Sequence, residues 1–91
     1  MFRSRRTKRF RALFEALPEH AQRQAIADYQ LFRQNPRHPG LQFKQIGKRA
    51  LSIYSARADE HYRAIGFLEG DTITWFWIGS HEEYNTISTR L

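Results

Sequence analysis

The spacing of the apolar residues changes part-way along the chain, and this change limits the fold to few possibilities. Up to residue 35, apolar side chains recur every three or four residues, the spacing that gathers them on one face of a helix. They are Phe10, Leu13, Phe14 and Leu17 in a first helix and Ala21, Ala25, Ile26, Tyr29 and Phe32 in a second. Pro18 ends the first helix and suits the first turn of the second, which Asn35 and Pro36 close.

After Pro39 and Gly40, apolar and polar residues alternate, as they do in β-strands. Strands are predicted at residues 41–44, 51–53, 62–68 and 72–78, with a short leading strand at residues 2–4. The tail, residues 82–91, is predicted as a short helix or an irregular cap. Helices followed by a run of strands predict an α+β fold, with two N-terminal helices packed on one face of a twisted antiparallel sheet of about four strands. The other face is left for a ligand or a partner.

The last two strands carry a hairpin signal, because Gly70 can adopt a positive φ in a two-residue turn with Asp71. Such a turn places small residues opposite the two indoles, which favours this register. The predicted pairs are Leu68 with Ile73, Gly66 with Trp75, Ala64 with Trp77 and Arg63 with Ile78. The register brings Arg63 to the corner where the chain leaves the last strand towards His81.

The chain of 91 residues has room for one hydrophobic core and contains no internal repeat, so residues 1–91 are predicted to form a single domain. It contains no cysteine, which excludes disulfides, thiolate zinc sites and cysteine nucleophiles and fits a reducing compartment. The longest apolar run, residues 75–78, is far too short to cross a bilayer. No membrane partner is predicted, and the expected location is the cytoplasm.

The formal net charge of +6 is unevenly distributed, with acidic residues clustered late in the chain. The basic residues at the start are Arg3, Arg5, Arg6, Lys8, Arg9 and Arg11. A polyanionic partner is the leading interpretation, with nucleic acid ahead of anionic lipid or an acidic protein. The alternative is that the basic composition only aids solubility.

The sequence contains no phosphate-binding glycine loop and no nucleophile elbow, and its four histidines lack metal-ligand spacing. No metal and no cofactor are therefore predicted. Arg57 and Arg63 lie on or beside central strands, where a guanidinium is costly to bury unless an anion meets it. That anion is either a phosphate or carboxylate of a ligand, or an internal acid. The internal candidates are Asp59, Glu60, Glu82 and Glu83.

His81 and Tyr84 are three residues apart and share a face if their segment is helical. Tyr84 is either part of the site or a cap on the core. A histidine, a phenol and nearby arginines suit metal-independent RNA cleavage, in which a 2′-hydroxyl loses its proton and attacks the adjacent phosphate. Any phosphate-binding protein also uses arginine, so these residue types alone do not establish that chemistry.

Four stretches of the sequence match a known family in their order and motifs. They are FRALFEALP at residues 10–18, NPRHPGLQFKQI at residues 35–46, YSARADEHYRAIGF at residues 54–67 and DTITWFWIGSHEEYNTI at residues 71–87. The L-x-F-K strand, the Y-R opening of the penultimate strand and the G-x-H-x-x-Y ending resemble the RelE/ParE superfamily of toxins from bacterial toxin–antitoxin modules. The resemblance implies a compact toxin that a cognate antitoxin neutralises.

RelE-like members of this superfamily cut mRNA on the ribosome, so the resemblance implies roles for several residues. Arg63 would stabilise the phosphorane, His81 would replace the C-terminal basic residue, and Tyr84 would match the terminal aromatic that stacks on the base. Arg57 is the fourth catalytic candidate. His81 is the first choice as general base, because no glutamate occurs in residues 40–44, where one branch of the superfamily has its base. The alternative bases are Glu82 and Glu83, and the expected phosphate contacts are Lys44, Lys48 and Arg49.

Two other functions remain open at this point. ParE-like members of the superfamily poison DNA gyrase without cutting RNA, and a non-catalytic nucleic-acid-binding module would also use a basic surface. The working hypothesis is a ribosome-dependent endoribonuclease whose partners are an antitoxin, the ribosome and mRNA. DNA gyrase is the alternative target.

Overall fold

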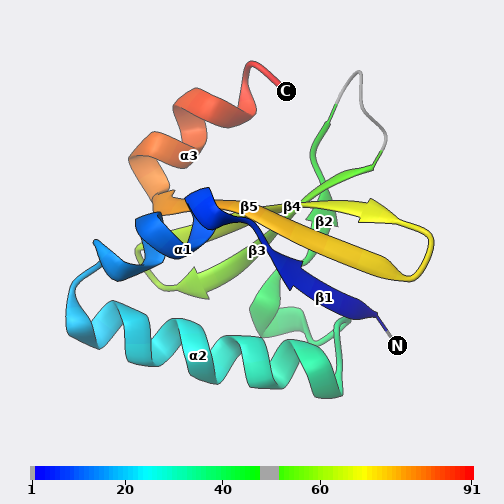
Figure 1. The fold of residues 1–91 in the computed structure, drawn as a ribbon, viewed down its shortest axis with the longest axis horizontal. Coiled ribbons are helices and arrows are strands. Elements are labelled where there is room, and N and C mark those ends of the chain that lie inside the picture. The colour runs from blue at the N-terminus through cyan, green and yellow to red at the C-terminus, as the bar shows by residue number, and fades with distance from the viewer. Residues whose placement is uncertain (1, 48–51) are drawn as a thin grey trace.

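The computed structural model describes residues 2–47 and 52–91, and Figure 1 shows helices packed against one twisted sheet. The strands are β1 (Arg3–Arg6), β2 (Lys44–Gln45), β3 (Ile53–Asp59), β4 (Tyr62–Glu69) and β5 (Thr72–Ser80). The helices are α1 (Lys8–Glu15), α2 (Glu19–Gln34) and α3 (His81–Ser88), with a short 3-10 turn, η1, at Pro39–Leu41. The α+β class is confirmed.

The sheet has five strands in the order β1-β5-β4-β3-β2, and β1 runs parallel to β5. The five strands agree with the prediction of about four strands and a short leading strand, and the prediction of an antiparallel sheet is wrong only for β1, which makes the sheet mixed. This leading strand begins and ends later than expected, at Arg3–Arg6 rather than residues 2–4. Its sequence, Arg-Ser-Arg-Arg, has no apolar alternation, so its place depends on the free edge of β5 and not on a local pattern.

The predicted strand at residues 41–44 is also wrong. Leu41 ends η1 and is almost fully buried, and the next residue, Gln42, has a left-handed backbone with φ of 50°. The chain pairs with β3 only over Lys44–Gln45. Part of the strand predicted at residues 51–53 lies outside the described residues, and β3 begins at Ile53.

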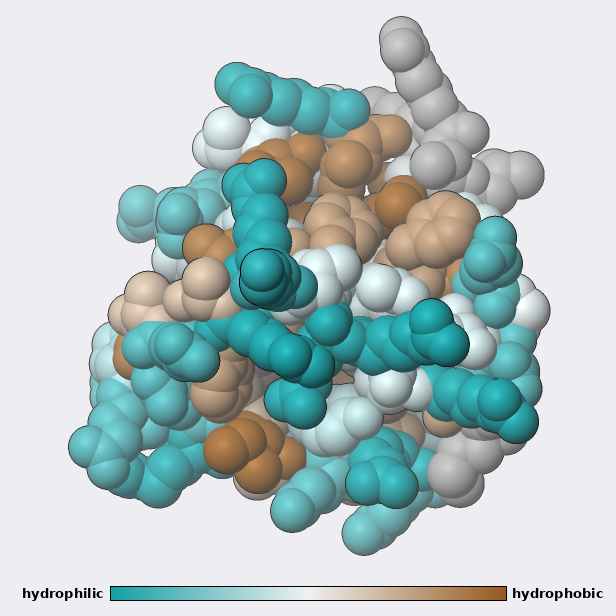
Figure 2. Space-filling model, viewed as in Figure 1, coloured by the Kyte–Doolittle hydropathy of each residue, from teal (hydrophilic) through white to brown (hydrophobic). Residues whose placement is uncertain are grey.

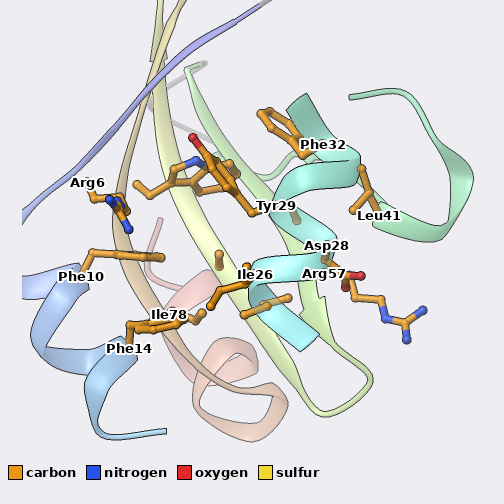
Figure 3. Close-up of a pocket in the computed structure, with 15 residues that line it drawn as sticks. Arg6, Phe10, Phe14, Ile26, Asp28, Tyr29, Phe32, Leu41, Arg57 and Ile78 are labelled. Atoms are coloured by element: carbon orange, nitrogen blue, oxygen red, sulfur yellow. The ribbon is translucent and has the colours of Figure 1, made fainter. Parts of the chain in front are cut away.

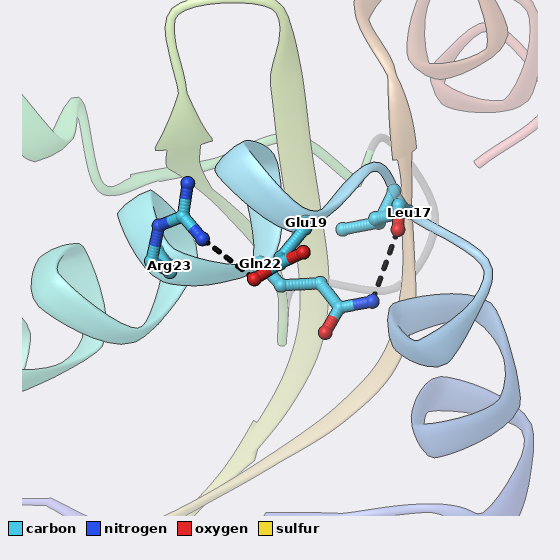
Figure 4. A network of polar contacts seen from close by, with 4 residues as sticks. All are labelled: Leu17, Glu19, Gln22 and Arg23. Carbon is cyan, nitrogen blue, oxygen red and sulfur yellow. Dashed lines mark hydrogen bonds and ion pairs between the residues drawn. The ribbon is translucent and has the colours of Figure 1, made fainter.

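Local hydrogen bonds fix the connection between the first two helices. Thr7 caps α1, since its Oγ1 accepts the amide of Phe10 at 3.1 Å. Gln22 of α2 donates through Nε2 to the carbonyl oxygen of Leu17 at 3.0 Å, which ties α2 to the turn that follows α1 (Figure 4). The neighbouring ion pair between Arg23 and Glu19, 2.8 Å long, is exposed and contributes little to stability.

The hairpin of β4 and β5 confirms the predicted turn and only the first half of the predicted register. Gly70 has φ of 61°, and the pairs Leu68 with Ile73 and Gly66 with Trp75 are present. Between Ile65 and Gly66 the register shifts.

This bulge changes the pairing at the far end of the hairpin. Trp77 lies opposite Ile65, Ala64 opposite Ile78 and Arg63 opposite Gly79, so the predicted pairs of Ala64 with Trp77 and Arg63 with Ile78 are wrong. An extra residue lets both Phe76 and Trp77 pack in the cluster beneath α3.

The core lies on both faces of the sheet, because neighbouring residues of a strand point to opposite sides. Ala64 belongs to the cluster formed with α1 and α2, while Ile65 belongs to the cluster formed with α3. The C-terminal tail forms the helix α3, which agrees with one of the two predictions for residues 82–91. This helix packs on the face of the sheet opposite α1 and α2, so it covers part of the face that was expected to be free for a ligand.

The basic residues at the start of the chain lie on β1, α1 and their junction, and all six are exposed. Figure 2 shows hydrophilic side chains crossing this side of the molecule over β1 and the start of α1. Within residues 2–47 and 52–91, no helix is long and apolar enough to span a membrane.

Candidate functional site

A polar hollow of about 410 Å³ lies at the end of the sheet where β3 turns into β4 and β5 passes into α3. It is lined by Gln42, Arg57, Asp59, Glu60, Arg63 and His81, and we call it the arginine pocket. The sheet register assembles it, since Arg57 lies directly opposite Arg63 and Arg63 opposite Gly79. Residues far apart in the sequence therefore converge here, and the convergence of Arg63 with His81 agrees with the prediction from the hairpin.

Arg63 is buried, with 5% of its surface exposed, and its hydrogen-bond partners within residues 2–47 and 52–91 are neutral. Its Nη1 donates to Oε1 of Gln42 at 2.8 Å, and its Nη2 donates to the Gln42 carbonyl at 3.3 Å and to Oγ of Ser55 at 3.1 Å. Its Nε is buried without a partner among the described residues. No carboxylate lies within 4.0 Å of this guanidinium in that part of the chain, so its charge is not compensated by an internal acid.

Arg57 faces the same hollow and likewise has no ion pair among residues 2–47 and 52–91. Its Nε is also buried without a hydrogen-bond partner in that part of the chain. Two guanidinium groups lining one hollow repel each other, and an anion bound between them would relieve this repulsion. The arrangement thus favours a phosphate or carboxylate ligand.

The acids of the pocket are engaged in the turn between β3 and β4. Oδ1 of Asp59 accepts the amide of His61 at 3.0 Å, and Oε1 of Glu60 lies 2.9 Å from Nε2 of the same histidine. The internal ion pairs that the sequence offered as an alternative for Arg57 are therefore absent among the described residues. Both arginines remain available to an external anion.

The first turn of α3 places the remaining predicted residues. Ser80 caps this helix in a reciprocal pair with Glu83, whose carboxylate accepts from both the amide and the hydroxyl of Ser80. His81 is exposed and borders the arginine pocket, with its ring 5.9 Å from that of Tyr84. The prediction that these two side chains share a helical face is confirmed.

Tyr84 lies behind the pocket and not in its lining. Its ring is buried, the Arg63 guanidinium lies 5.0 Å from its centroid, and its hydroxyl donates to Oγ of Ser55 at 3.1 Å. The tyrosine therefore supports Arg63 from below. A stacking contact between this ring and a base would require the surrounding side chains to move.

The other predicted site residues lie outside this group. Glu82 and Glu83 are exposed, and Glu83 is already occupied as a helix cap. Lys44 is exposed on β2 and does not line the arginine pocket. Lys48 and Arg49 lie outside the described residues.

Sequence reasoning missed Gln42 and Ser55, which hold Arg63 in place. Ser55 is fully buried and accepts hydrogen bonds from both Arg63 and Tyr84. Its position within an apolar strand was the one signal in the sequence, because a hydroxyl buried there needs hydrogen-bond partners and so indicates polar neighbours. Gln42 carried no such signal, because its left-handed backbone is usual for glycine or asparagine.

The described residues contain no cluster of three or more acidic or histidine side chains suited to a metal ion.

Comparison with known families identifies the chain. Residues 19–86 match the family described as ParE-like toxin domain. The chain belongs to this family. Comparison of the sequence with curated proteins gives no significant match.

Solved structures of toxins share the fold of this toxin domain. The RelB-RelE antitoxin-toxin complex from Methanococcus jannaschii contains a chain with a TM-score of 0.72 and 18% identity, covering 91% of this chain and 96% of that one. YafQ from E. coli strain BL21(DE3) gives a TM-score of 0.69 at 10% identity, with coverage of 92% and 98%. A chain of the RelBE2 toxin-antitoxin complex from Mycobacterium tuberculosis gives 0.67 at 17% identity, with coverage of 88% and 98%. At these identities the likeness establishes the fold.

Proposed function

We propose that this chain is the toxin of a toxin–antitoxin module and that it cleaves mRNA on the ribosome, without a metal ion, at the arginine pocket. The observation that carries the proposal is the buried Arg63, which has no carboxylate partner among the described residues and lies beside Arg57 and His81 in an open hollow. A binding site for a phosphate needs this arrangement, whereas a structural arginine in a core normally pairs with an acid.

The proposed chemistry assigns one task to each side chain. His81 takes the proton of a ribose 2′-hydroxyl as O2′ bonds to the adjacent phosphorus, since imidazole accepts and donates protons near neutral pH. Arg57 and Arg63 stabilise the negative charge that builds on the phosphorane oxygens. The bond from phosphorus to O5′ then breaks, O5′ takes up a proton from water, and His81 returns its proton to the solvent. The products are a 2′,3′-cyclic phosphate and a 5′-hydroxyl.

The environment of Arg63 suits this task. Hydrogen bonds to Gln42 and Ser55 fix the plane of its guanidinium, so little reorganisation is needed when the phosphate arrives. Tyr84 is a positioning residue in this proposal, because it contacts Arg63 and Ser55 and does not line the pocket.

The solved relatives support an antitoxin as partner. Several of the similar structures are complexes of a toxin with an antitoxin, among them the RelB-RelE complex from Methanococcus jannaschii and the DinJ-YafQ complex from E. coli. The exposed basic residues of β1 and α1 suit an acidic segment of such a protein. They also suit the phosphate backbone of RNA, and the two uses are compatible because antitoxin and RNA need not bind together.

A gyrase-directed toxin is the second candidate, and the ParE-like description of the family favours it. In that case the arginine pocket binds a carboxylate of the target protein and breaks no bond. The purified toxin would then inhibit DNA supercoiling while translation continued.

The test measures mRNA cleavage, translation and supercoiling with the same preparation of purified toxin. We expect translation arrest with new mRNA ends, and we expect His81→Gln to lower the cleavage rate by roughly 10²-fold or more. His20→Gln is the matched control, since His20 is an exposed helical histidine outside the pocket. Arg63→Lys keeps the charge but loses the planar fork, and we expect a fall of about 10²-fold.

Two results would overturn the proposal. Wild-type toxin that blocks supercoiling and leaves mRNA intact would establish the gyrase alternative. Full cleavage by folded His81→Gln and Arg63→Lys variants would show that RNA is cut somewhere other than the arginine pocket.

A further inference from the structure

A second hollow, of about 150 Å³, lies between α1, α2 and the sheet, and its lining is mostly aromatic and aliphatic (Figure 3). Five aromatic side chains line it, from both helices and from β5: Phe10, Phe14, Tyr29, Phe32 and Trp75. An enclosed apolar cavity of about this volume holds one benzene ring, so the hollow has room for a single six-membered ring. Aromatic walls favour a planar aromatic ring, because edge-to-face and offset contacts add to the burial of apolar area. We call this hollow the aromatic cavity.

The aromatic cavity reaches the surface between α2 and the junction of β1 with α1. Two of its lining residues are exposed there, Ile26 on α2, which is 50% exposed, and Arg6 at the end of β1. The half-exposed side chain of Ile26 borders this opening, so a small molecule can reach the hollow from the surface beside it.

Arg6 supplies a charge at this entrance. It lines the cavity on the side of Phe10 in Figure 3 and forms no ion pair or side-chain hydrogen bond within residues 2–47 and 52–91. The acid of the lining, Asp28, lies at the other end beside Arg57. A ligand with its ring between the helices and the sheet would therefore place a substituent near an unpaired guanidinium.

We propose that the aromatic cavity binds a small aromatic carboxylate, with the ring among the five aromatic side chains and the carboxylate paired with Arg6. Of the residues that line this site, Arg57 also lines the arginine pocket, but the ring and the carboxylate would lie away from it, and the site does not depend on the proposed ribonuclease function. The size of the cavity limits the ligand to about one ring, and the charge of Arg6 selects an acid over a neutral analogue.

The test compares benzoate with benzamide, which has nearly the same shape and no charge, by NMR titration of the full chain. We expect benzoate to bind with a Kd of roughly 1 mM or below, a usual range for a ligand of this size, and benzamide to bind about five- to tenfold more weakly. The indole N–H of Trp75, which donates to Oγ of Ser4, is a direct reporter of occupancy.

Variants at two positions separate the ring from the charge. Ala25→Leu fills the cavity from α2 and should abolish binding, whereas Ala27→Leu, an exposed position on the same helix, should not. Arg6→Gln should remove the preference for benzoate, and Arg5→Gln, exposed on the same strand and outside the lining, should keep it. Because Arg6 is exposed, its variant tests the proposal even if Ala25→Leu fails to fold.

Three outcomes would overturn the proposal. They are equal affinity for benzoate and benzamide in the wild type, shifts confined to the residues of the arginine pocket, and unchanged binding in a folded Ala25→Leu variant.

Discussion

Replacing Ser55 with alanine is the sharpest perturbation of the support beneath the arginine pocket. The Ser55 side chain is fully buried, and its Oγ accepts the Tyr84 hydroxyl at 3.1 Å and Nη2 of Arg63 at 3.1 Å. Alanine has nearly the same shape, so the substitution removes two hydrogen bonds with little change in packing.

The expected cost follows from what each partner loses. The Tyr84 hydroxyl is left buried without an acceptor, which costs about 1–3 kcal/mol. Nη2 of Arg63 keeps only the longer bond to the Gln42 carbonyl, so part of a charge-assisted bond is lost as well. We expect Ser55→Ala to lower the free energy of unfolding by about 2–4 kcal/mol. For a domain of this size that corresponds to a fall in Tm of roughly 10–20 °C.

Urea denaturation with a double-mutant cycle measures this effect. Tyr84→Phe removes the hydroxyl that Ser55 accepts, so Ser55→Ala should cost about 1 kcal/mol less in the Tyr84→Phe background than in the wild type. Ser88→Ala is the control, because this serine is only partly buried near the end of α3 and should change stability by less than about 0.5 kcal/mol.

Two results would refute the reasoning. If Ser55→Ala lowers the free energy of unfolding by less than about 1 kcal/mol, the Ser55 hydroxyl does not accept both hydrogen bonds. Equal costs in the two backgrounds would show that Ser55 and Tyr84 are not coupled.

Four further predictions concern other parts of the molecule. Burial raises the pKa of Asp28 above its ordinary value, so the folded state holds this proton more tightly than the unfolded chain. The wild type should therefore lose stability relative to Asp28→Asn as pH rises from about 3.5 through the raised pKa, because the carboxylate is harder to ionise in the folded state. Denaturation of both proteins at several pH values measures this difference in the free energy of unfolding. Gly66→Ala should cost about 1–3 kcal/mol in thermal melts, since its Cβ would lie 2.8 Å from Cε3 of Trp75. Thr7→Ala should cost about 1 kcal/mol, because α1 loses its N-cap. Neutralising Lys8, Arg9 and Arg11 together should make RNA binding less dependent on salt, lowering the slope of log K against log salt by about 2 if all three contact phosphates.

The sequence by itself determined the elements whose signals are local. Helical periodicity located α1 and α2, and alternation with the Gly70 turn located β4, β5 and half of their register. The meeting of Arg63 with His81 was predicted from the hairpin, and it persists despite the bulge because the shift moves Arg63 from Ile78 to Gly79, which is still closer to His81 in the chain.

Contacts between distant residues decided the rest. The bulge opposite Ile65 arises because Phe76 and Trp77 both pack beneath α3, and β1 has its place because β5 offers a free edge. The same holds for the support of Arg63, where Gln42 just after η1, Ser55 of β3 and Tyr84 of α3 meet in space. A guanidinium takes its hydrogen-bond partners from whatever surrounds it after folding, so no spacing in the sequence could show which oxygens would fix Arg63 or that no acid of residues 2–47 and 52–91 would pair with it.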